Sequence, residues 1–352
     1  MRRLISFLAI ASALAAPAAA AAAGPIAVKV IIVTTFDQDY DNPKGTGEAN
    51  GEASRWIERL HMTQVLPLPG AFRPIHMNTD GVVEIMTGMA TARAAASTTA
   101  LGLDPRFDLT KAYWILAGTA GVDPAAASQG SAAWAEWVVD GDLAGSIDPR
   151  EIPPDWPDGR IPWDGTTPFD RPGANIGQFY HLNAGLVHWA YGLTKDVKLD
   201  DSAPLQAFGR RFEGYPVAQQ PPSVILGDSI GSDRFFHGEI MARWAEDWDR
   251  IYTRGAGRLA ISDCEDAGVC LALQRLAAMG RVDFSRLLIL RTACNFTVPP
   301  TGVTAAKSLF GDTISDSSGV AYLPALEADY RVGSVVALKL LDGWDKYRDR
   351  VP

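Results

Sequence analysis

The chain has 352 residues, of which 47% are hydrophobic and 21% are charged, as is ordinary for a folded globular protein. Its formal net charge of -9 argues against nucleic acid or an anionic membrane surface as the main partner, since those surfaces require clustered Lys and Arg side chains. We therefore expect a small, uncharged substrate and no nucleic-acid partner.

The first 23 residues have the pattern of a secretory signal peptide. A basic start and an apolar segment at residues 4–10 precede an alanine-rich tract at residues 11–23. We predict cleavage between Ala20 and Ala23, and therefore export to the periplasm or the cell exterior. The alternative is an uncleaved membrane anchor, which so weakly apolar a tract disfavours. Residues 24–352 contain no other apolar run near the roughly 20 residues that cross a bilayer, so we expect a soluble mature chain that is not a carrier by itself.

The mature chain alternates strand-like and helix-like segments. In chain order, runs of β-branched and aliphatic side chains predict strands at residues 29–36, 82–86, 113–117, 223–228 and 286–291. Helical patterns occupy residues 52–60, 92–101, 179–193, 204–212, 240–248 and 335–347. This alternation predicts a single α/β domain of three layers (αβα), with helices on both faces of a mixed central sheet.

Two features interrupt this alternation. Residues 140–177 are rich in Pro, Gly, Trp and Asp without periodicity, so we interpret them as a long insertion over the functional site. Glycine turns are predicted after two of the strands, at Gly88 and from Gly118 to Gly121, as is needed where a backbone approaches a ligand closely.

The segment from residue 259 to residue 295 carries the clearest chemistry. An acidic turn containing Glu265 opens an apolar helix, and the following strand ends at Asn295. Ligands of open α/β sheets bind at the carboxyl ends of strands, so both side chains are predicted to face one small molecule. A carboxylate suits sugar hydroxyls, and an amide suits the edge of a purine.

The three cysteines, Cys264, Cys270 and Cys294, match neither a zinc site nor a disulfide framework. We interpret them as small apolar side chains packed under the site, and we expect no metal.

Together these segments resemble the purine nucleoside permease family, whose chains look like the nucleoside phosphorylase and nucleosidase superfamily. The resemblance rests on the glycine motif at residues 118–121, on Cys-Glu-Asp-Ala at 264–267 and on Arg-Thr-Ala-Cys-Asn at 291–295, in the order that the superfamily uses. It runs from about residue 29 to the C-terminal helix. It implies a nucleoside phosphorylase-like fold, a purine nucleoside ligand, no resident cofactor and a homo-oligomer.

The resemblance also implies roles for individual residues. Glu265 would hold the ribose hydroxyls and favour the cationic sugar of the transition state, although Asp266, inserted beside it, departs from the superfamily pattern. Asn295 would bond the purine and stabilise it as the leaving group. Further ligand contacts are expected at Gly118, Thr119, Gly121, Phe235, Phe236 and His237.

The attacking group decides the reaction type. Phosphorylases of this superfamily bind phosphate with arginines, but Leu116 and the Thr-Phe-Asp sequence at residues 35–37 occupy those places here. Nucleosidases instead hold a water, and Glu52, Thr87 and Arg291 match their water-binding residues. Hydrolysis is therefore favoured, with Glu52 as general base, oriented by Arg291.

Arg93 is the one feature that keeps phosphate open as a co-substrate, and its alternative role is that of an exposed helix charge. Each remaining candidate also has a structural alternative. Glu265 and Glu52 suit helix N-termini, Asn295 suits a turn, and Arg291 suits a structural ion pair.

The sequence therefore favours an exported enzyme that cleaves purine nucleosides, with water or with phosphate. A second hypothesis is a non-catalytic nucleoside-binding component of uptake, which would need a separate membrane transporter. A third is a protein that keeps the fold and has lost the activity. A binder needs Glu265 but has no use for Glu52 as a base.

Overall fold

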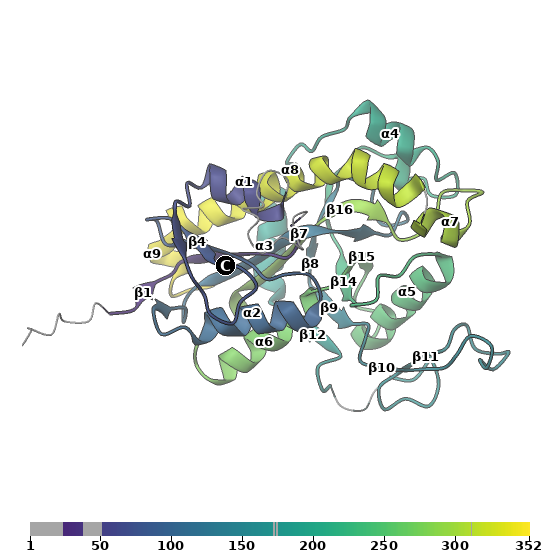
Figure 1. Ribbon diagram of the computed structural model, residues 1–352, viewed down its shortest axis with the longest axis horizontal. Coiled ribbons are helices and arrows are strands. Elements are labelled where there is room, and N and C mark those ends of the chain that lie inside the picture. The colour runs from purple at the N-terminus through teal and green to yellow at the C-terminus, as the bar shows by residue number, and fades with distance from the viewer. Residues whose placement is uncertain (1–23, 38–50, 172, 174, 311) are drawn as a thin grey trace, which may run out of the picture.

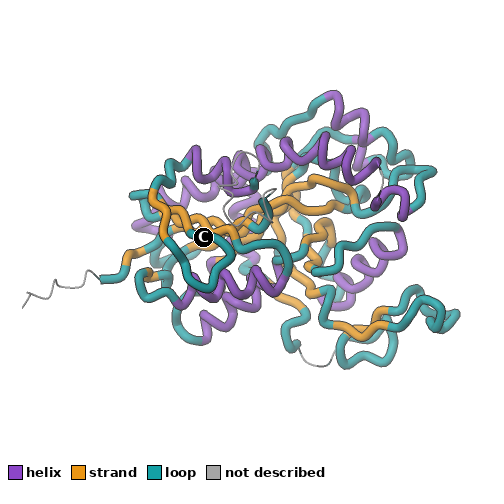
Figure 2. Tube along the Cα trace, in the orientation of Figure 1, coloured by secondary structure: helices purple, strands orange, loops and turns teal. Residues whose placement is uncertain are grey.

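The computed structural model describes residues 24–37, 51–171, 173, 175–310 and 312–352. In this part of the chain a large sheet lies between two layers of helices (Figures 1 and 2). The predicted α/β architecture with a mixed central sheet is therefore confirmed. The predicted signal peptide lies outside the described residues, as does most of the loop between residues 37 and 51.

The main sheet has 12 strands within the described residues. They are β2 (Val30–Thr34), β3 (Gln64–Leu66), β4 (Ile75–Met77), β5 (Val82–Met86), β7 (Tyr113–Val122), β8 (Ala132–Ala135), β9 (Trp137–Asp140), β12 (Phe179–His181), β13 (Val224–Leu226), β14 (Asp228–Gly231), β15 (Leu259–Asp263) and β16 (Leu287–Phe296). Their order is β12-β9-β14-β15-β7-β2-β5-β4-β3, while β16 pairs with β7 and β8, and β8 also pairs with β13. Strands β2 and β16 run parallel to β7, whereas β15 runs antiparallel to it, so the sheet is mixed around β7.

Helices cover both faces of this sheet. Helices α1 and α8 lie on one face, and α2, α5 and α6 lie on the other (Figure 1). The helices are α1 (Glu52–Arg59), α2 (Thr91–Leu103), α3 (Ala184–Thr194), α4 (Ala203–Gly209), α5 (Glu239–Thr253), α6 (Asp266–Ala278), α7 (Ala305–Phe310), α8 (Asp312–Asp342) and α9 (Trp344–Tyr347), with short 3₁₀ turns η1 (Val217–Gln219) and η2 (Phe284–Arg286). Pairs of two short strands, β1 (Ile26–Ala27) with β6 (Phe107–Asp108) and β10 (Ala144–Ser146) with β11 (Arg160–Pro162), complete the described elements.

Three predicted elements differ from the structure. The glycine turn after residue 117 is wrong, because β7 continues to Val122 and pairs with β16 along its length, which satisfies the backbone without a turn. The helix predicted at residues 179–193 begins as strand β12, which pairs with β9, and becomes helical only after Asn183, whose side chain accepts from the Leu186 amide. The final helix, predicted at residues 335–347, begins much earlier, at Asp312, and is divided at Gly343 into α8 and α9.

The segment at residues 140–177 contains a short ribbon, β10 with β11, that lies beside α5 (Figure 1). The Arg160 guanidinium lies 4.6 Å from the ring centroid of Trp244 on α5. Strands of three residues are too short to show periodicity, so they could not be predicted from the pattern of side chains. That this segment covers the functional site stays a prediction.

Helix α8 packs closely against α1. A Cβ atom at Gly333 would lie 2.7 Å from Cη2 of Trp56, so a larger residue has no room there. The Trp56 indole nitrogen also donates a hydrogen bond of 2.9 Å to the Asp329 carboxylate on α8. Helix α8 therefore fixes the position of α1 and of Glu52, its first residue.

Substitution Gly333→Ala should destabilise the protein by about 1–3 kcal/mol, because the added methyl group overpacks the contact with Trp56. Gly192→Ala, in α3, is the matched control, since a Cβ atom there meets nothing within 4 Å. That change should stabilise by about 0.5–1 kcal/mol through helix propensity. Urea unfolding of both variants measures the difference, and equal effects would contradict the close packing of α8 on α1.

The buried Asp329 carboxyl should make stability depend on pH. Burial raises its pKa from 3.8 to about 8, so the folded chain holds a proton that the unfolded chain releases. This contribution to stability is complete below about pH 4 and is lost as pH rises through 8, by at most about 1.4 kcal/mol per unit. Asp329→Asn should therefore gain stability relative to the wild type between pH 5 and pH 8. Chemical unfolding at pH 5 and pH 8 measures this gain. If the difference in unfolding free energy between Asp329→Asn and the wild type is the same at both pH values, this carboxyl does not titrate as proposed.

Candidate active site

Glu52 lies buried between the ends of β2 and β7, with 2% of its surface exposed. Its Oε2 atom accepts hydrogen bonds from the Thr35 amide (2.8 Å), the Phe36 amide (3.0 Å) and the Thr35 hydroxyl (3.1 Å). Its Oε1 atom accepts from the Thr119 amide (2.7 Å) and the Thr119 hydroxyl (2.8 Å). Glu52 is therefore not a solvated first-turn carboxylate, because it joins α1 to two strands of the sheet.

Arg291 on β16 is completely buried among carboxylates. Its Nε and Nη2 atoms donate to Oδ1 of Asp266 at 3.0 and 2.8 Å. Nη2 also donates to Oε2 of Glu265 at 2.8 Å, and Nη1 donates to the Thr119 carbonyl at 3.2 Å. Burial by itself lowers the pKa of Arg291, but the neighbouring carboxylates outweigh it and raise the pKa well above its usual value, so the guanidinium stays charged.

Glu265 joins this ion-pair cluster to the loop before α2. Its Oε1 atom accepts a hydrogen bond of 3.1 Å from the Ala90 amide, and 4% of the residue is exposed. Ala90 has a positive φ of 88°, which is uncommon for a residue with a side chain and points its amide at this carboxylate. Burial raises the pKa of Glu265, and the charge of Arg291 opposes that rise.

Asp263 and Asp266 hold the start of α6. Oδ1 of Asp263 accepts from the amides of Glu265 and Asp266, both at 2.8 Å, which caps the helix. The Ser229 hydroxyl lies within hydrogen-bonding distance of the other oxygen of each aspartate. Because a hydroxyl donates only one proton, two simultaneous bonds require one of the carboxyls to be protonated. Burial, which raises the pKa of Asp266, favours this state.

Two glycines of β7 make room for the site. A Cβ atom at Gly118 would lie 2.8 Å from both Nη1 of Arg291 and Oε2 of Glu52. A Cβ atom at Gly121 would lie 3.1 Å from the side-chain nitrogen of Asn295. The glycine motif thus serves side-chain packing inside a strand and not a turn.

Asn295 lies next to a bulge in β16, where the register with β7 shifts between Ala293 and Asn295. Bulges re-aim side chains and are frequent beside active sites. The Asn295 amide nitrogen contacts the Phe296 carbonyl at 3.3 Å, and Cys294 donates to the Asn295 side-chain oxygen at 3.3 Å. Asn295 therefore lies further along the same strand than Arg291, toward its carboxyl end.

The remaining candidates lie around this cluster. The Thr87 hydroxyl is buried and lies 3.2 Å from both the Thr34 and the Gly88 carbonyl oxygens, either of which can accept its one proton, so it links the ends of β5 and β2. The exposed Arg93 donates to the Met89 carbonyl at 3.3 Å, on the loop that also carries Ala90.

The three residues predicted to stack on the base have different surroundings. Phe236 is buried and packs edge-on against Trp244 at 5.4 Å, whereas Phe235 is 52% exposed. His237 contacts the Ser308 hydroxyl at 2.7 Å, and burial lowers its pKa. Base stacking by these residues stays a prediction.

Sequence reasoning missed part of this cluster. Asp266 stood out only as an insertion, yet in the structure it is a principal partner of Arg291. Thr35 was considered only as a position without charge, and Ser229 gave no signal. Both act through contacts distant in sequence, 17 residues for Thr35 with Glu52 and 37 for Ser229 with Asp266.

Within the described residues the centre of the site carries an excess of negative charge. Glu52, Glu265, Asp263 and Asp266 surround a single guanidinium, that of Arg291. A site of this kind attracts a cation, accommodates a neutral ligand and repels a dianion. These features describe a buried acidic centre just beyond β2 and β15 and beside the middle of β7 and β16.

Comparison with known proteins identifies the family of this chain. The model of the purine nucleoside permease family matches residues 27–352, so the chain belongs to that family. It is 28% identical over 303 residues to the purine nucleoside permease of Candida albicans, covering 84% of this chain and 73% of that protein. A protein of Schizosaccharomyces pombe described as a probable purine nucleoside permease is 28% identical over 278 residues, covering 74% of this chain and 79% of the relative.

Solved structures show the fold. The 5'-methylthioadenosine/S-adenosylhomocysteine nucleosidase of Neisseria meningitidis has a TM-score of 0.51 at 14% identity, covering 89% of this chain and 99% of that one. Futalosine hydrolase of Helicobacter pylori has a TM-score of 0.52 at 12% identity, covering 89% and 98%. The fold is therefore of the nucleosidase type. None of the helices in the described part of the chain combines the length and apolarity needed to cross a membrane.

Substitution Asp266→Ala should destabilise the protein by about 3–5 kcal/mol, because it leaves the buried Arg291 charge without a principal partner. The surface pair of Arg250 with Asp247, at 2.5 Å, provides the control, and Asp247→Ala should cost less than about 1 kcal/mol. Chemical unfolding measures both free energies. A small effect of Asp266→Ala would mean that the remaining carboxylates suffice for Arg291.

Proposed function

We propose that this protein binds a purine nucleoside and cleaves its N-glycosidic bond with water, releasing the base and ribose. Two kinds of relative support the proposal. The curated relatives of the family are named for purine nucleosides, and the fold neighbours are a nucleosidase and a hydrolase. The proposed ligand is also small and uncharged, which suits the acidic centre.

The observation that carries the proposal is the placement of Glu265. Its carboxylate is held between the Ala90 amide and Arg291, just beyond the end of β15. We assign it to the ribose hydroxyls, which donate to carboxylates in charge-assisted hydrogen bonds. As the glycosidic bond breaks, the sugar gains positive charge that this carboxylate stabilises.

In the proposed reaction the water oxygen attacks the anomeric carbon and the bond to the purine nitrogen breaks. The electron pair of that bond stays on the purine, where a hydrogen bond from Asn295 stabilises it. The proton lost by the water goes to Glu52. Arg291 lies beside Glu52 across Gly118 and keeps the centre from accumulating further negative charge.

Both oxygens of Glu52 already accept hydrogen bonds, so the water must replace a donor. The hydrogen bond from the Thr35 hydroxyl, at 3.1 Å, is the longest of the five. It can be broken by rotation of the Thr35 side chain. Loss of this bond opens one lone pair of Glu52 to the water. The amide bonds from Thr35, Phe36 and Thr119 then keep the carboxylate in place.

Charge favours water over phosphate as the attacking group. A phosphate dianion would lie next to four acidic side chains with only Arg291 in opposition, and that arginine is already bonded to Asp266 and Glu265. Arg93, exposed near the start of α2, is the residue we assign to phosphate if the reaction is phosphorolysis.

A second candidate function is nucleoside binding without turnover, as part of an uptake system with a separate membrane transporter. The family name favours it, and so does the saturated hydrogen bonding of Glu52. For either function we propose an exported, periplasmic or secreted protein, supported by the signal-peptide pattern of residues 1–23, and a homo-oligomer, supported by the superfamily resemblance.

Release of free base from inosine, guanosine and adenosine, with and without phosphate, tests the proposal. Release without phosphate is the expected result. Glu265→Ala should abolish nucleoside binding, and Glu52→Gln should bind nucleoside but release base at least about 100-fold more slowly. Glu58→Gln, an exposed change on the same helix, is the matched control and should behave as the wild type.

Other outcomes separate the alternatives. Strict dependence on phosphate would show a phosphorylase and give Arg93 a role. A measurable nucleoside dissociation constant without release would show a binding protein. Unchanged affinity in Glu265→Ala would remove the proposed ribose site altogether.

A further inference from the structure

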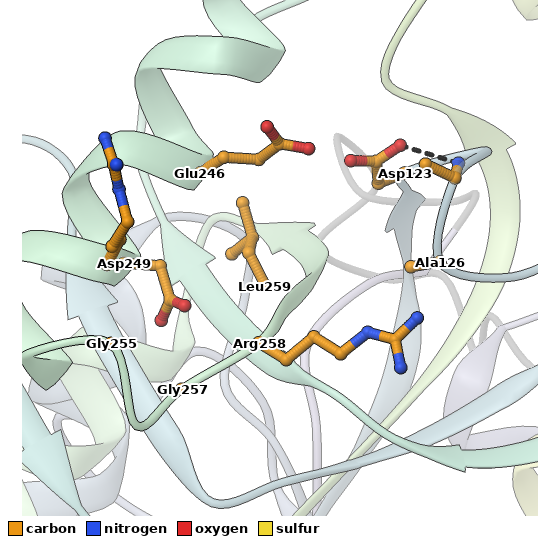
Figure 3. Close-up of a pocket in the computed structure, with 10 residues that line it drawn as sticks. Asp123, Ala126, Glu246, Asp249, Gly255, Gly257, Arg258 and Leu259 are labelled. Carbon is orange, nitrogen blue, oxygen red and sulfur yellow. Dashed lines mark hydrogen bonds between the residues drawn. The ribbon is translucent and has the colours of Figure 1, made fainter.

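A second acidic cleft lies away from Glu265, between the end of β7, the start of β15 and helix α5 (Figure 3). Its volume is about 300 Å³, enough for a small molecule. The cleft begins at Leu259, whereas the site described above follows Asp263 at the other end of β15. Four residues of strand separate the two by about 13 Å, so one small ligand does not fill both.

Asp249 on α5 is the feature of this cleft that points to a ligand. It lines the cleft, only 2% of its surface is exposed, and its Oδ1 atom has no hydrogen-bond partner among the described residues. A buried carboxylate oxygen without a donor costs free energy, so native structures seldom leave one unused. A donor from a bound molecule would satisfy it.

The surrounding backbone leaves this carboxyl open. A Cβ atom at Gly257 would lie 3.0 Å from Oδ1 of Asp249 and 2.6 Å from Oδ2 of Asp228, so only glycine fits beside both. Figure 3 shows the Asp249 carboxylate beside Gly257, on the lower side of the cleft.

Two more carboxylates line the opposite side. Asp123 accepts a hydrogen bond of 2.8 Å from the Ala125 amide through one oxygen, and the Glu246 side chain points toward Asp123 (Figure 3). The cations at the rim are Arg250, which pairs with Asp247 at 2.5 Å, and the exposed Arg258. Glu246 and Asp123 share a side-chain hydrogen bond, and within the described residues none of the three carboxyls of the lining forms an ion pair inside the cleft.

We propose that this cleft binds a small aliphatic diamine, with one ammonium group on Asp249 and the other between Asp123 and Glu246. An ammonium group is a compact charge with three donors, which suits an unpartnered carboxylate oxygen. A single metal ion fits less well, because the described residues contain no group of three acidic, His or Cys side chains arranged around one point. Two ammonium groups joined by a flexible chain span carboxyls that lie apart.

The protonation of the lining supports this assignment. Burial, and next the charge of Asp228 on β14, raise the pKa of Asp249 to about 7. Burial, and next the contact with Asp123, raise the pKa of Glu246 to about 7. Arg258 also faces this region. A bound dication favours the ionised carboxyls, so it should bind more tightly at pH 8 than at pH 6.

Calorimetric titration of the purified full chain with 1,4-diaminobutane tests the proposal, with 1,4-butanediol as the uncharged probe of the same length. The diamine should bind and the diol should not. Asp249→Asn and Glu246→Gln should each weaken diamine binding about tenfold or more, since each removes a charged hydrogen-bond acceptor. Glu239→Gln, an exposed change at the start of α5 outside the cleft, should leave it unchanged.

Three results would overturn the proposal: no binding of diamine by the wild type, equal affinity in the wild type and both cleft variants, or binding of Mg²⁺ that excludes the diamine and depends on Asp249. If Asp249→Asn does not fold, the exposed Glu246→Gln decides the question alone. Base release from nucleoside, measured in the same variants, should be unchanged, because neither substitution touches the Glu265 site. This measurement distinguishes failure of the diamine proposal from failure of the proposed nucleoside function.

Discussion

The buried guanidinium of Arg291 is the group on which the arrangement of the site depends. Removing a charge of this kind from water costs several kcal/mol, and only well-placed partners offset that cost. Those partners come from β7, through the Thr119 carbonyl, and from the start of α6, through Glu265 and Asp266. Satisfying one charge therefore brings β16, β7 and α6 to a single point.

The position of Glu52 follows from a different constraint, the packing of the two ends of the chain. Helix α8 fits against α1 through Gly333 and bonds Trp56 through Asp329, and this contact places the first residue of α1 over β7. Gly118 then leaves enough space for the Glu52 carboxylate and Arg291 to lie side by side. Segments near both ends of the sequence thus build one centre.

The local sequence pattern predicted the strands and helices that are determined by local interactions. The strand at residues 82–86 was predicted with its observed bounds, because its five residues are all buried and most are β-branched or aliphatic. Gly118 was misinterpreted, since glycine in a turn and glycine that leaves room for two long side chains look alike in sequence. The pairing of Arg291 with Asp266 spans 25 residues, and the bridge from Ser229 spans 37, so only the folded sheet brings them together.

The same geometry is compatible with both proposed functions, binding and hydrolysis, and the hydrogen bonds to Glu52 separate the two. A carboxylate whose two oxygens already accept five hydrogen bonds is well positioned but has little room for a further donor. A binding protein gains from that saturation, since the centre stays rigid. A hydrolase must lose one donor when the substrate and water enter. Two of the five donors are threonine hydroxyls, which rotate at little cost, whereas the three amides are fixed by the backbone. In the proposed hydrolysis, turnover would therefore depend on Thr35 and Thr119 as much as on Glu52 itself.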